Sequence, residues 1–188
     1  MVDQLPKELS DEEVAKRVQG GEIEIFGVLV ERYEQKLKRY GRKYLARQED
    51  VQDIVQDIFL STYQNIKGFN TNQRFSPWIY RIAHNAFVNA LRKNERSYVL
   101  TNFDTIISGL AYNDPSESER EQIEIRKLID EGLANLPPKY REVLVLHYLE
   151  ELGYKDIADI LQIPLGTVGV RLKRAKEQLK ANLAKHKL

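Results

Sequence analysis

Residues 154–179 read YKDIADILQIPLGTVGVRLKRAKEQL. This stretch has the spacing of a helix-turn-helix: an amphipathic segment over Tyr154–Leu161, a turn over Gln162–Gly166, and a second helix from Thr167. The second helix has an apolar stripe that we expect to face inward, and its basic residues then face outward, where they suit a DNA groove. An ordinary helical hairpin with a solvated lysine-rich face is the alternative interpretation. The stripe consists of Val168, Leu172, Ala175 and Leu179, and the outward set of Arg171, Lys173, Arg174 and Lys176.

Charge is distributed unevenly along the chain, although the formal net charge is only +1. Residues 166–188 contain seven basic residues and one acid, Glu177. Such a segment attracts phosphate. Residues 49–57, by contrast, contain Glu49, Asp50, Asp53 and Asp57 and no basic residue. That face is expected to repel DNA and to suit a basic protein partner.

Apolar residues recur at helical spacing along most of the chain, as at Val51, Ile54, Val55, Ile58 and Phe59. Alternating strand patterns are nearly absent. We therefore predict an all-α fold of two small helical domains joined by a flexible linker. The expected helices are Asp11–Gln19, Ile23–Ala46, Glu49–Ile66, Pro77–Arg96, Glu119–Ala134, Pro138–Leu149, Tyr154–Leu161 and Thr167–Lys185.

The helix expected over Pro77–Arg96 has a clear start signal and a polar face. Ser76 is the predicted N-cap and Pro77 the first helical residue. Spacings of three and four place five polar residues on one face. Asparagine offers a donor and an acceptor for base edges, and arginine suits phosphates, so this face resembles a nucleic-acid surface. A solvated face, with Asn85 bonded to nearby backbone, is the alternative. The row is Arg81, Asn85, Asn89, Arg92 and Arg96.

Aromatic residues cluster just before and at the start of that helix. Stacking on unpaired bases is one role for them. We expect core packing instead, including burial of Trp78. The cluster is Phe69, Phe75, Trp78 and Tyr80.

Composition excludes several other classes. The chain has 188 residues, which is long enough for two small domains. Its composition, with 42% hydrophobic and 30% charged residues, is typical of a globular protein. It has no cysteine, and its three histidines (His84, His147 and His186) form no cluster with ligand spacing. We therefore expect no metal, no cofactor and no disulfide. No apolar stretch approaches the length of a membrane span, and the N-terminus lacks a signal-peptide pattern, so a cytosolic protein without membrane insertion is expected.

Four motifs stand in order along the chain: DIVQDIF at 53–59, WIYRIAHN at 78–85, LPPKYR at 136–141 and IPLGTV at 163–168. In this order they resemble extracytoplasmic-function (ECF) sigma factors of the sigma-70 family. The match covers nearly the whole chain except the polar segment that begins at Ser97. The resemblance implies an N-terminal segment with a first helix (1–25), a region 2 domain (26–96), a linker (97–122) and a region 4 domain (123–188).

The resemblance also implies partners and site residues, and no catalysis by the chain itself. Asp50, Asp53, Gln56 and Asp57 would bind the clamp helices of the largest subunit of RNA polymerase core, which supplies the chemistry. The polar row from Arg81 to Arg96, with the loop before Pro77, would recognise and open the −10 element. The −35 element would be read by Thr167 together with the outward basic residues of that helix. An anti-sigma factor is a further expected partner, and the protein is expected in the cytoplasm, at the nucleoid when in holoenzyme.

Some positions depart from the family pattern. Gly169 and Val170 stand where the family commonly has a basic residue and a serine, and Gly153 replaces the usual serine cap. Glycine also lowers helix propensity by about 1 kcal/mol relative to alanine. We therefore expect −35 specificity to rest on Arg171, Lys173 and DNA shape.

Three other functions compete with this interpretation. A stand-alone helix-turn-helix regulator explains Gly153–Lys185 but leaves the acidic row without a role. A helical hydrolase would use His84 or His147, but no nucleophile or acid pair accompanies either. A helical adaptor would have no DNA contact, so salt-dependent DNA binding by the Thr167 helix would exclude it.

Overall fold

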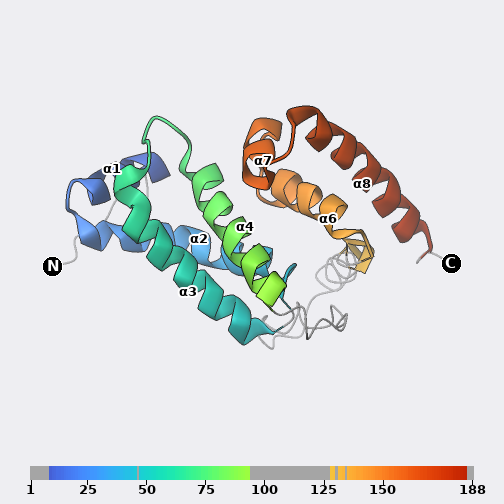
Figure 1. Cartoon of the computed structure of the whole chain (residues 1–188), viewed down its shortest axis with the longest axis horizontal. Helices are drawn as coiled ribbons and strands as arrows, with labels where there is room; N and C mark the ends of the chain where they lie inside the picture. Colours follow the sequence, from blue (N-terminus) through green and yellow to red (C-terminus); the bar gives the residue numbers. More distant parts are fainter. Residues whose placement is uncertain (1–8, 46, 94–127, 130, 134, 186–188) are drawn as a thin grey trace, which may run out of the picture. The chain divides into compact units, whose positions relative to one another are not determined.

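The computed structural model describes residues 9–45, 47–93, 128–129, 131–133 and 135–185. Throughout these residues the regular structure is helical, with no strand (Figure 1). The described residues form two compact units, one N-terminal and one C-terminal. The predicted all-α fold with two helical domains is therefore confirmed, while the predicted flexible linker (97–122) lies outside the described residues. None of the described helices is long and apolar enough to span a membrane.

The N-terminal unit consists of helices α1 (Asp11–Gln19), α2 (Phe26–Gly41), α3 (Gln48–Asn65) and α4 (Phe75–Lys93) (Figure 1). Short 3-10 turns, η1 (Ile23–Ile25) and η2 (Ile66–Gly68), precede α2 and follow α3. Helix α3 packs against both α2 and α4, and α1 packs across α2, η2 and the start of α4. Burial of one apolar stripe from each helix forms the core. Its fully buried side chains include Leu29, Leu37, Tyr40, Ile58, Phe75, Ile79, Tyr80 and Phe87.

Helix α2 ends earlier than the apolar pattern predicts. We expected a helix through Ala46, but α2 ends at Gly41, and residues 42–44 form a turn. Gly41 is buried against the ring of Phe87 from α4: a Cβ atom added there would lie 2.3 Å from that ring. The close approach of α4 therefore requires glycine at the last turn of α2.

Helix α4 begins at Phe75, two residues before the predicted start, so Ser76 is not its N-cap. The reason is a long-range contact: the Phe75 N–H donates to the Glu12 carboxylate of α1, at 2.8 Å. Glu12 thereby satisfies one of the N–H groups that a helix start leaves without an intrahelical acceptor. The Ser76 hydroxyl instead hydrogen-bonds to Tyr33.

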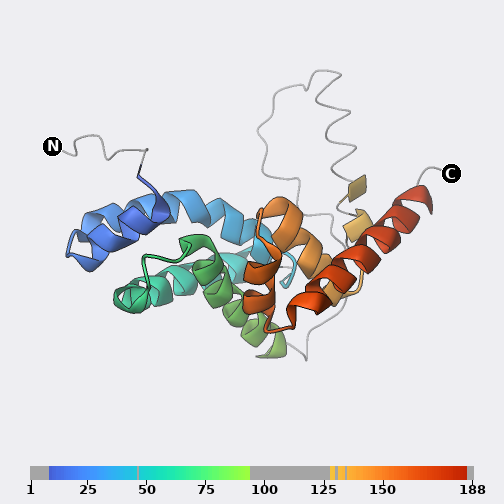
Figure 2. The same cartoon turned by 90° about the horizontal axis from the view of Figure 1, so that it is seen from above.

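The C-terminal unit contains α6 (Pro138–Leu144), the π-helical turn η3 (Val145–Leu149), α7 (Tyr154–Leu161) and α8 (Leu165–Lys185) (Figure 2). The predicted helix over Pro138–Leu149 therefore changes type at Val145, where the carbonyl accepts from the Glu150 N–H. Helix α8 starts two residues before Thr167 and packs along α6. Of the predicted Glu119–Ala134 helix, only residues 128–129 and 131–133 are described, and they are helical.

Candidate partner and nucleic-acid surfaces

An acidic surface lies on the first half of α3. Asp53, Gln56 and Asp57 are exposed, while Val51, Val55 and Ile58 on the opposite side are buried. Asp50, one turn earlier, is half-buried, and its carboxylate lies 4.0 Å from Nε of Arg47. We call Asp53, Gln56 and Asp57 the acidic surface. Neither Asp53 nor Asp57 forms an ion pair within the residues that the structure describes, so their two carboxylates, with an amide between them, suit a basic or hydrogen-bonding partner.

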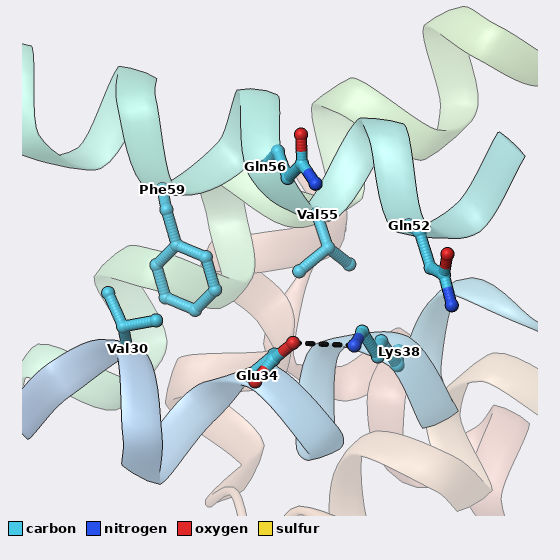
Figure 3. A pocket seen from close by; sticks show the side chains of 7 residues that line it. All are labelled: Val30, Glu34, Lys38, Gln52, Val55, Gln56 and Phe59. Atoms are coloured by element: carbon cyan, nitrogen blue, oxygen red, sulfur yellow. Dashed lines mark hydrogen bonds and ion pairs between the residues drawn. The ribbon is translucent and has the colours of Figure 1, made fainter. Parts of the chain in front are cut away.

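A groove separates α2 from α3 beside the acidic surface (Figure 3). Its volume is about 240 Å³. Gln56 belongs both to this groove and to the acidic surface. The Lys38 ammonium pairs with the Glu34 carboxylate at 2.5 Å along the α2 wall. Sequence reasoning missed this groove, although Val30, Glu34 and Lys38 follow one another at a spacing of four. The lining side chains are Val30, Glu34, Lys38, Gln52, Val55, Gln56 and Phe59.

Every described residue of the polar row predicted on α4 is exposed. Arg81, Asn85, Asn89 and Arg92 are all exposed, and we call these four the amide row. Within the described residues neither asparagine side chain hydrogen-bonds to backbone or to another side chain, which disfavours the alternative of a backbone-bonded Asn85. Their donors and acceptors therefore face solvent. Arg96, the last predicted member, lies outside the described residues.

The loop between η2 and α4 is anchored by aromatic rings. Phe69 and Phe75, at its two ends, are buried, with ring centroids 5.4 Å apart, and Trp78 packs against both. Core packing is thus confirmed for these two phenylalanines and for Tyr80. Trp78 was predicted to be buried but is only half-buried, although it packs against the aromatic core. Between the anchors, Asn70, Asn72, Gln73 and Arg74 are exposed.

Helices α7 and α8 form the predicted helix-turn-helix. The α7 range agrees with the prediction, and Gln162 closes it in the left-handed conformation (φ 53°). The Ile163 N–H then donates to the Ala158 carbonyl at 3.0 Å, and the Thr167 N–H to the Pro164 carbonyl at 2.8 Å. At the start of α7 the Gly153 N–H donates to the Asp156 carboxylate at 3.3 Å, which is one of the two hydrogen bonds of a capping box. The other bond would be accepted by a serine side chain at the N-cap, and Gly153 has no side chain to accept it.

The outward face of α8 is basic. Val168, Leu172 and Ala175 are buried as predicted, whereas Leu179 is half-buried. Lys173, Arg174 and Lys176 are exposed, and Arg171 and Thr167 are half-buried. We call Arg171, Lys173, Arg174 and Lys176 the basic face. The Lys176 ammonium lies 5.2 Å from the centroid of the Tyr148 ring, and the interaction with Tyr148 raises the pKa of that ammonium.

The two positions that depart from the family pattern differ in their surroundings. Gly169 is half-buried and faces Tyr154: an added Cβ would lie 3.7 Å from that ring. Val170 is 51% exposed, beside the basic face. Gly169 therefore lies on the side of α8 that faces Tyr154 of α7, with room for a Cβ atom, and Val170 is accessible to a ligand of α8.

The two described histidines have structural contacts. The His84 Nδ1 lies 3.3 Å from the hydroxyls of both Tyr40 and Tyr44. The His147 Nδ1 lies 2.9 Å from the Leu152 carbonyl. The His84 ring thus connects α4 to α2 and the turn that follows it, and the His147 ring connects η3 to the segment before α7. In the part of the chain that the structure describes, no group of three acidic, histidine or cysteine side chains is arranged to hold a metal ion.

Comparison with known proteins shows the family of the chain. The sigma-70 region 2 model matches residues 29–97 and the sigma-70 region 4 model matches residues 126–179. The chain is 34% identical over 179 residues to the ECF RNA polymerase sigma factor SigW of Bacillus subtilis, covering 89% of this chain and 94% of that one. It is 32% identical over 182 residues to the ECF RNA polymerase sigma-E factor of Escherichia coli K12, covering 93% and 95%.

Solved structures agree on the fold. CnrH, in complex with the cytosolic domain of CnrY, superposes with a TM-score of 0.67 at 24% identity, over 93% of this chain and 97% of that one. The sigma factor RpoE of Bartonella quintana, in complex with the anti-sigma factor NepR, gives 0.65 at 21% identity, over 85% and 96%. The protein is thus a member of the sigma-70 family. Within that family it belongs to the ECF RNA polymerase sigma factors.

Proposed function

We propose that the chain binds RNA polymerase core through the acidic surface of α3 together with Asp50. The partner would be the clamp helices of the largest polymerase subunit. Support comes from charge and exposure: Asp53, Gln56 and Asp57 lie on one side of α3 and are open to solvent. Their carboxylates repel DNA phosphate and attract basic side chains, so this surface suits protein rather than nucleic acid.

The observation that best supports promoter recognition is the solvent exposure of the amide row. Residues 26–96 would form the domain that recognises and opens the −10 element. Asn85 and Asn89 present hydrogen-bonding groups that are not used within the described fold, and Arg81 and Arg92 flank them with charge suited to phosphates. Arg96 belongs to the same row by spacing. The exposed residues of the loop before α4 extend this surface.

The C-terminal unit, over residues 123–188, would engage the −35 element. Helix α8 would enter the major groove with the basic face and Thr167, as the second helix of a helix-turn-helix does. The departures at Gly169 and Val170 leave Arg171 and Lys173 as the nearest charged side chains on that part of α8. Residues 1–25 would precede the region 2 domain, and residues 97–122 would join the two domains.

Further partners follow from the same proposal. The RpoE structure of Bartonella quintana contains an anti-sigma factor, and we expect one for this chain too. The polymerase core would supply the catalytic chemistry, so the chain would act as a specificity subunit without an active site of its own. It would function in the bacterial cytoplasm and, within holoenzyme, at the nucleoid.

In vitro transcription with purified bacterial core and a library of randomised promoters tests this function. We expect transcripts only when the chain and core are both present, and we expect selected templates to share a −35 and a −10 element. A core sample without the chain is the control. Sequence-selective binding to duplex DNA by the chain alone, with no stimulation of core, would instead support a stand-alone regulator.

A further inference from the structure

The loop between η2 and α4 is held in place by α1, which lies far from it in sequence. Within residues 70–74, three amide side chains and an arginine are exposed, and Thr71 is half-buried. Inside the loop, the Asn72 N–H donates to the Asn70 side-chain oxygen at 3.0 Å, and the Gln73 N–H to the Asn70 carbonyl at 2.9 Å. These two bonds define a tight turn but do not fix its position on the domain.

Gln19 of α1 holds the first end of the loop. Its side-chain Nε2 donates to the Ile66 carbonyl at 2.7 Å and to the Phe69 carbonyl at 2.8 Å. Both N–H groups of one amide are therefore used on backbone that precedes residue 70. Gln19 is half-buried at the end of α1, where the loop backbone passes.

Glu12 of α1 holds the other end. Its carboxylate accepts the Phe75 N–H at 2.8 Å, at the first residue of α4. A carboxylate at this position also suits the partial positive charge of a helix N-terminus. Gln19 and Glu12 lie two turns apart on α1, so one rigid helix holds both ends of the loop.

Helix α1 is itself fixed to the domain. The Asp11 carboxylate accepts from the Tyr33 hydroxyl at 2.5 Å and from the Arg32 guanidinium at 2.6 Å. Burial, and then the bond to Asp11, raise the pKa of Tyr33, so its hydroxyl stays a donor at neutral pH. Ser10 and Glu13 form a reciprocal capping box at the start of the helix. The helix that holds the loop is therefore anchored to α2 and stable at its own end.

We propose that α1 acts as a brace for the −10 recognition loop, and that Gln19 and Glu12 are positioning residues for promoter recognition. The inference rests on the proposed function, in which residues 70–74 lie at the −10 DNA. A loop ordered before binding loses less conformational entropy when it contacts DNA, and its side chains keep one geometry toward the bases. Without the brace, Phe69 and Phe75 would still be buried, but the polar residues between them would sample more conformations.

Two substitutions remove the brace, and two matched variants serve as controls. Gln19→Glu keeps the length of the side chain but replaces both donors with oxygens that repel the Ile66 and Phe69 carbonyls. Its control is Gln35→Glu, the same change at an exposed position of α2. Glu12→Ala removes the acceptor for Phe75, whereas Glu12→Gln retains a side-chain oxygen that accepts the same N–H. The full-length variants are assayed with core polymerase.

The main measurement is open-complex formation on the preferred −10 sequence relative to templates with one −10 base changed. We expect Gln19→Glu and Glu12→Ala to lower this ratio by roughly five- to tenfold, the size of losing one or two hydrogen bonds. Gln35→Glu should match the wild type, and Glu12→Gln should retain most of the preference. Affinity for core should be unchanged in all four variants.

Two results would overturn the brace: a wild-type ratio in both Gln19→Glu and Glu12→Ala, or an equal loss on every template together with weaker core binding. If Gln19→Glu does not fold, the comparison of Glu12→Ala with Glu12→Gln decides. Hydrogen exchange of amides 70–73 gives a separate readout, which we expect to be faster in Gln19→Glu than in Gln35→Glu. A wild type without any −10 preference would refute the proposed function instead, and unchanged exchange would then refute the brace as well.

Discussion

The amide row of α4 and the basic face of α8 are both exposed polar surfaces, but they differ in chemistry. The amide row places two asparagines between two arginines, whereas the basic face consists of four cations. An asparagine amide distinguishes bases through paired donors and acceptors, whereas arginine and lysine bind phosphate whatever the sequence and also bind the guanine edge in the major groove. We therefore propose that the amide row contributes base selectivity at the −10 element, and that the basic face contributes salt-dependent affinity at the −35 element in addition to its specificity there.

The acidic surface of α3 extends this comparison to a third helix. It belongs to the same unit as the amide row but has the opposite charge character. The N-terminal unit thus has two distinct surfaces: the acidic surface, which repels DNA, and the amide row, which suits DNA. Four predictions test this division, beginning with the largest expected effect.

Asp53→Ala combined with Asp57→Ala should abolish retention of core polymerase, a loss of about 100-fold or more. Truncating charged groups in a buried interface costs about 2–5 kcal/mol, and both carboxylates are exposed in the free chain, so the fold should be unaffected. Affinity is measured by pull-down or fluorescence titration with core. Glu24→Ala with Glu31→Ala, two other exposed acids of the N-terminal unit, is the charge-matched control. Undiminished retention by the α3 variant would remove the acidic surface from the core interface.

Asn85→Ala should weaken recognition at one −10 base position. Because a good bidentate base contact contributes about 1–3 kcal/mol of discrimination, open-complex formation should fall on the preferred base and change little on the other three. Templates with each of the four bases at every −10 position measure this. Gln64→Ala, an exposed amide on α3, is the control and should leave the preference intact. A uniform loss on all templates with a lower melting temperature would indicate a structural role for Asn85.

Arg171→Ala or Lys173→Ala should weaken −35 binding and make its salt dependence shallower. Loss of one phosphate contact makes the slope of log K against log salt shallower by about one unit. Titrations of holoenzyme with −35 DNA at several salt concentrations give the slope. Lys16→Ala removes one exposed charge from α1 and should leave it unchanged. If both α8 variants keep the wild-type slope, the phosphate contacts lie on another surface.

Helical periodicity predicted most of the fold because each helix buries one apolar stripe, and that stripe is visible in the sequence. The range of α7 and the exposure of the amide row were predicted for this reason. The start of α4 was not, because its acceptor is Glu12, more than sixty residues earlier in the chain. The need for glycine at position 41 likewise depends on a residue distant in sequence, Phe87 of α4. The groove between α2 and α3 was missed because it depends on how two helices pack side by side.

Among the candidate site residues, the sequence predicted which side chains are polar and on which helix face they lie. It did not predict that Asp50 is half-buried beside Arg47, or that Tyr148 contacts Lys176, since both depend on packing geometry. The roles of Gln19 and Glu12 had no local signal either. A glutamine at the end of one helix and a glutamate at its start are common surface residues, and only the position of the loop gives them partners.

The smallest expected effect concerns a glycine of α8. Gly169→Ala should stabilise the C-terminal unit by up to about 1 kcal/mol, because alanine has the higher helix propensity and its Cβ would make an ordinary contact, 3.7 Å from the Tyr154 ring. Gly41→Ala serves as the contrasting variant, in which an added Cβ atom has no room. The Cβ atom of alanine at position 41 would lie 2.3 Å from the Phe87 ring, so this substitution should destabilise the N-terminal unit by about 1–3 kcal/mol, as overpacking does. Denaturant unfolding of the full chain measures both changes. Since Gly169 faces α7 rather than the basic face, Gly169→Ala should also leave the salt slope of −35 binding unchanged. A Gly169→Ala variant that is as stable as the wild type or more stable, but binds −35 DNA more weakly, would instead show that the side of α8 facing Tyr154 also approaches DNA.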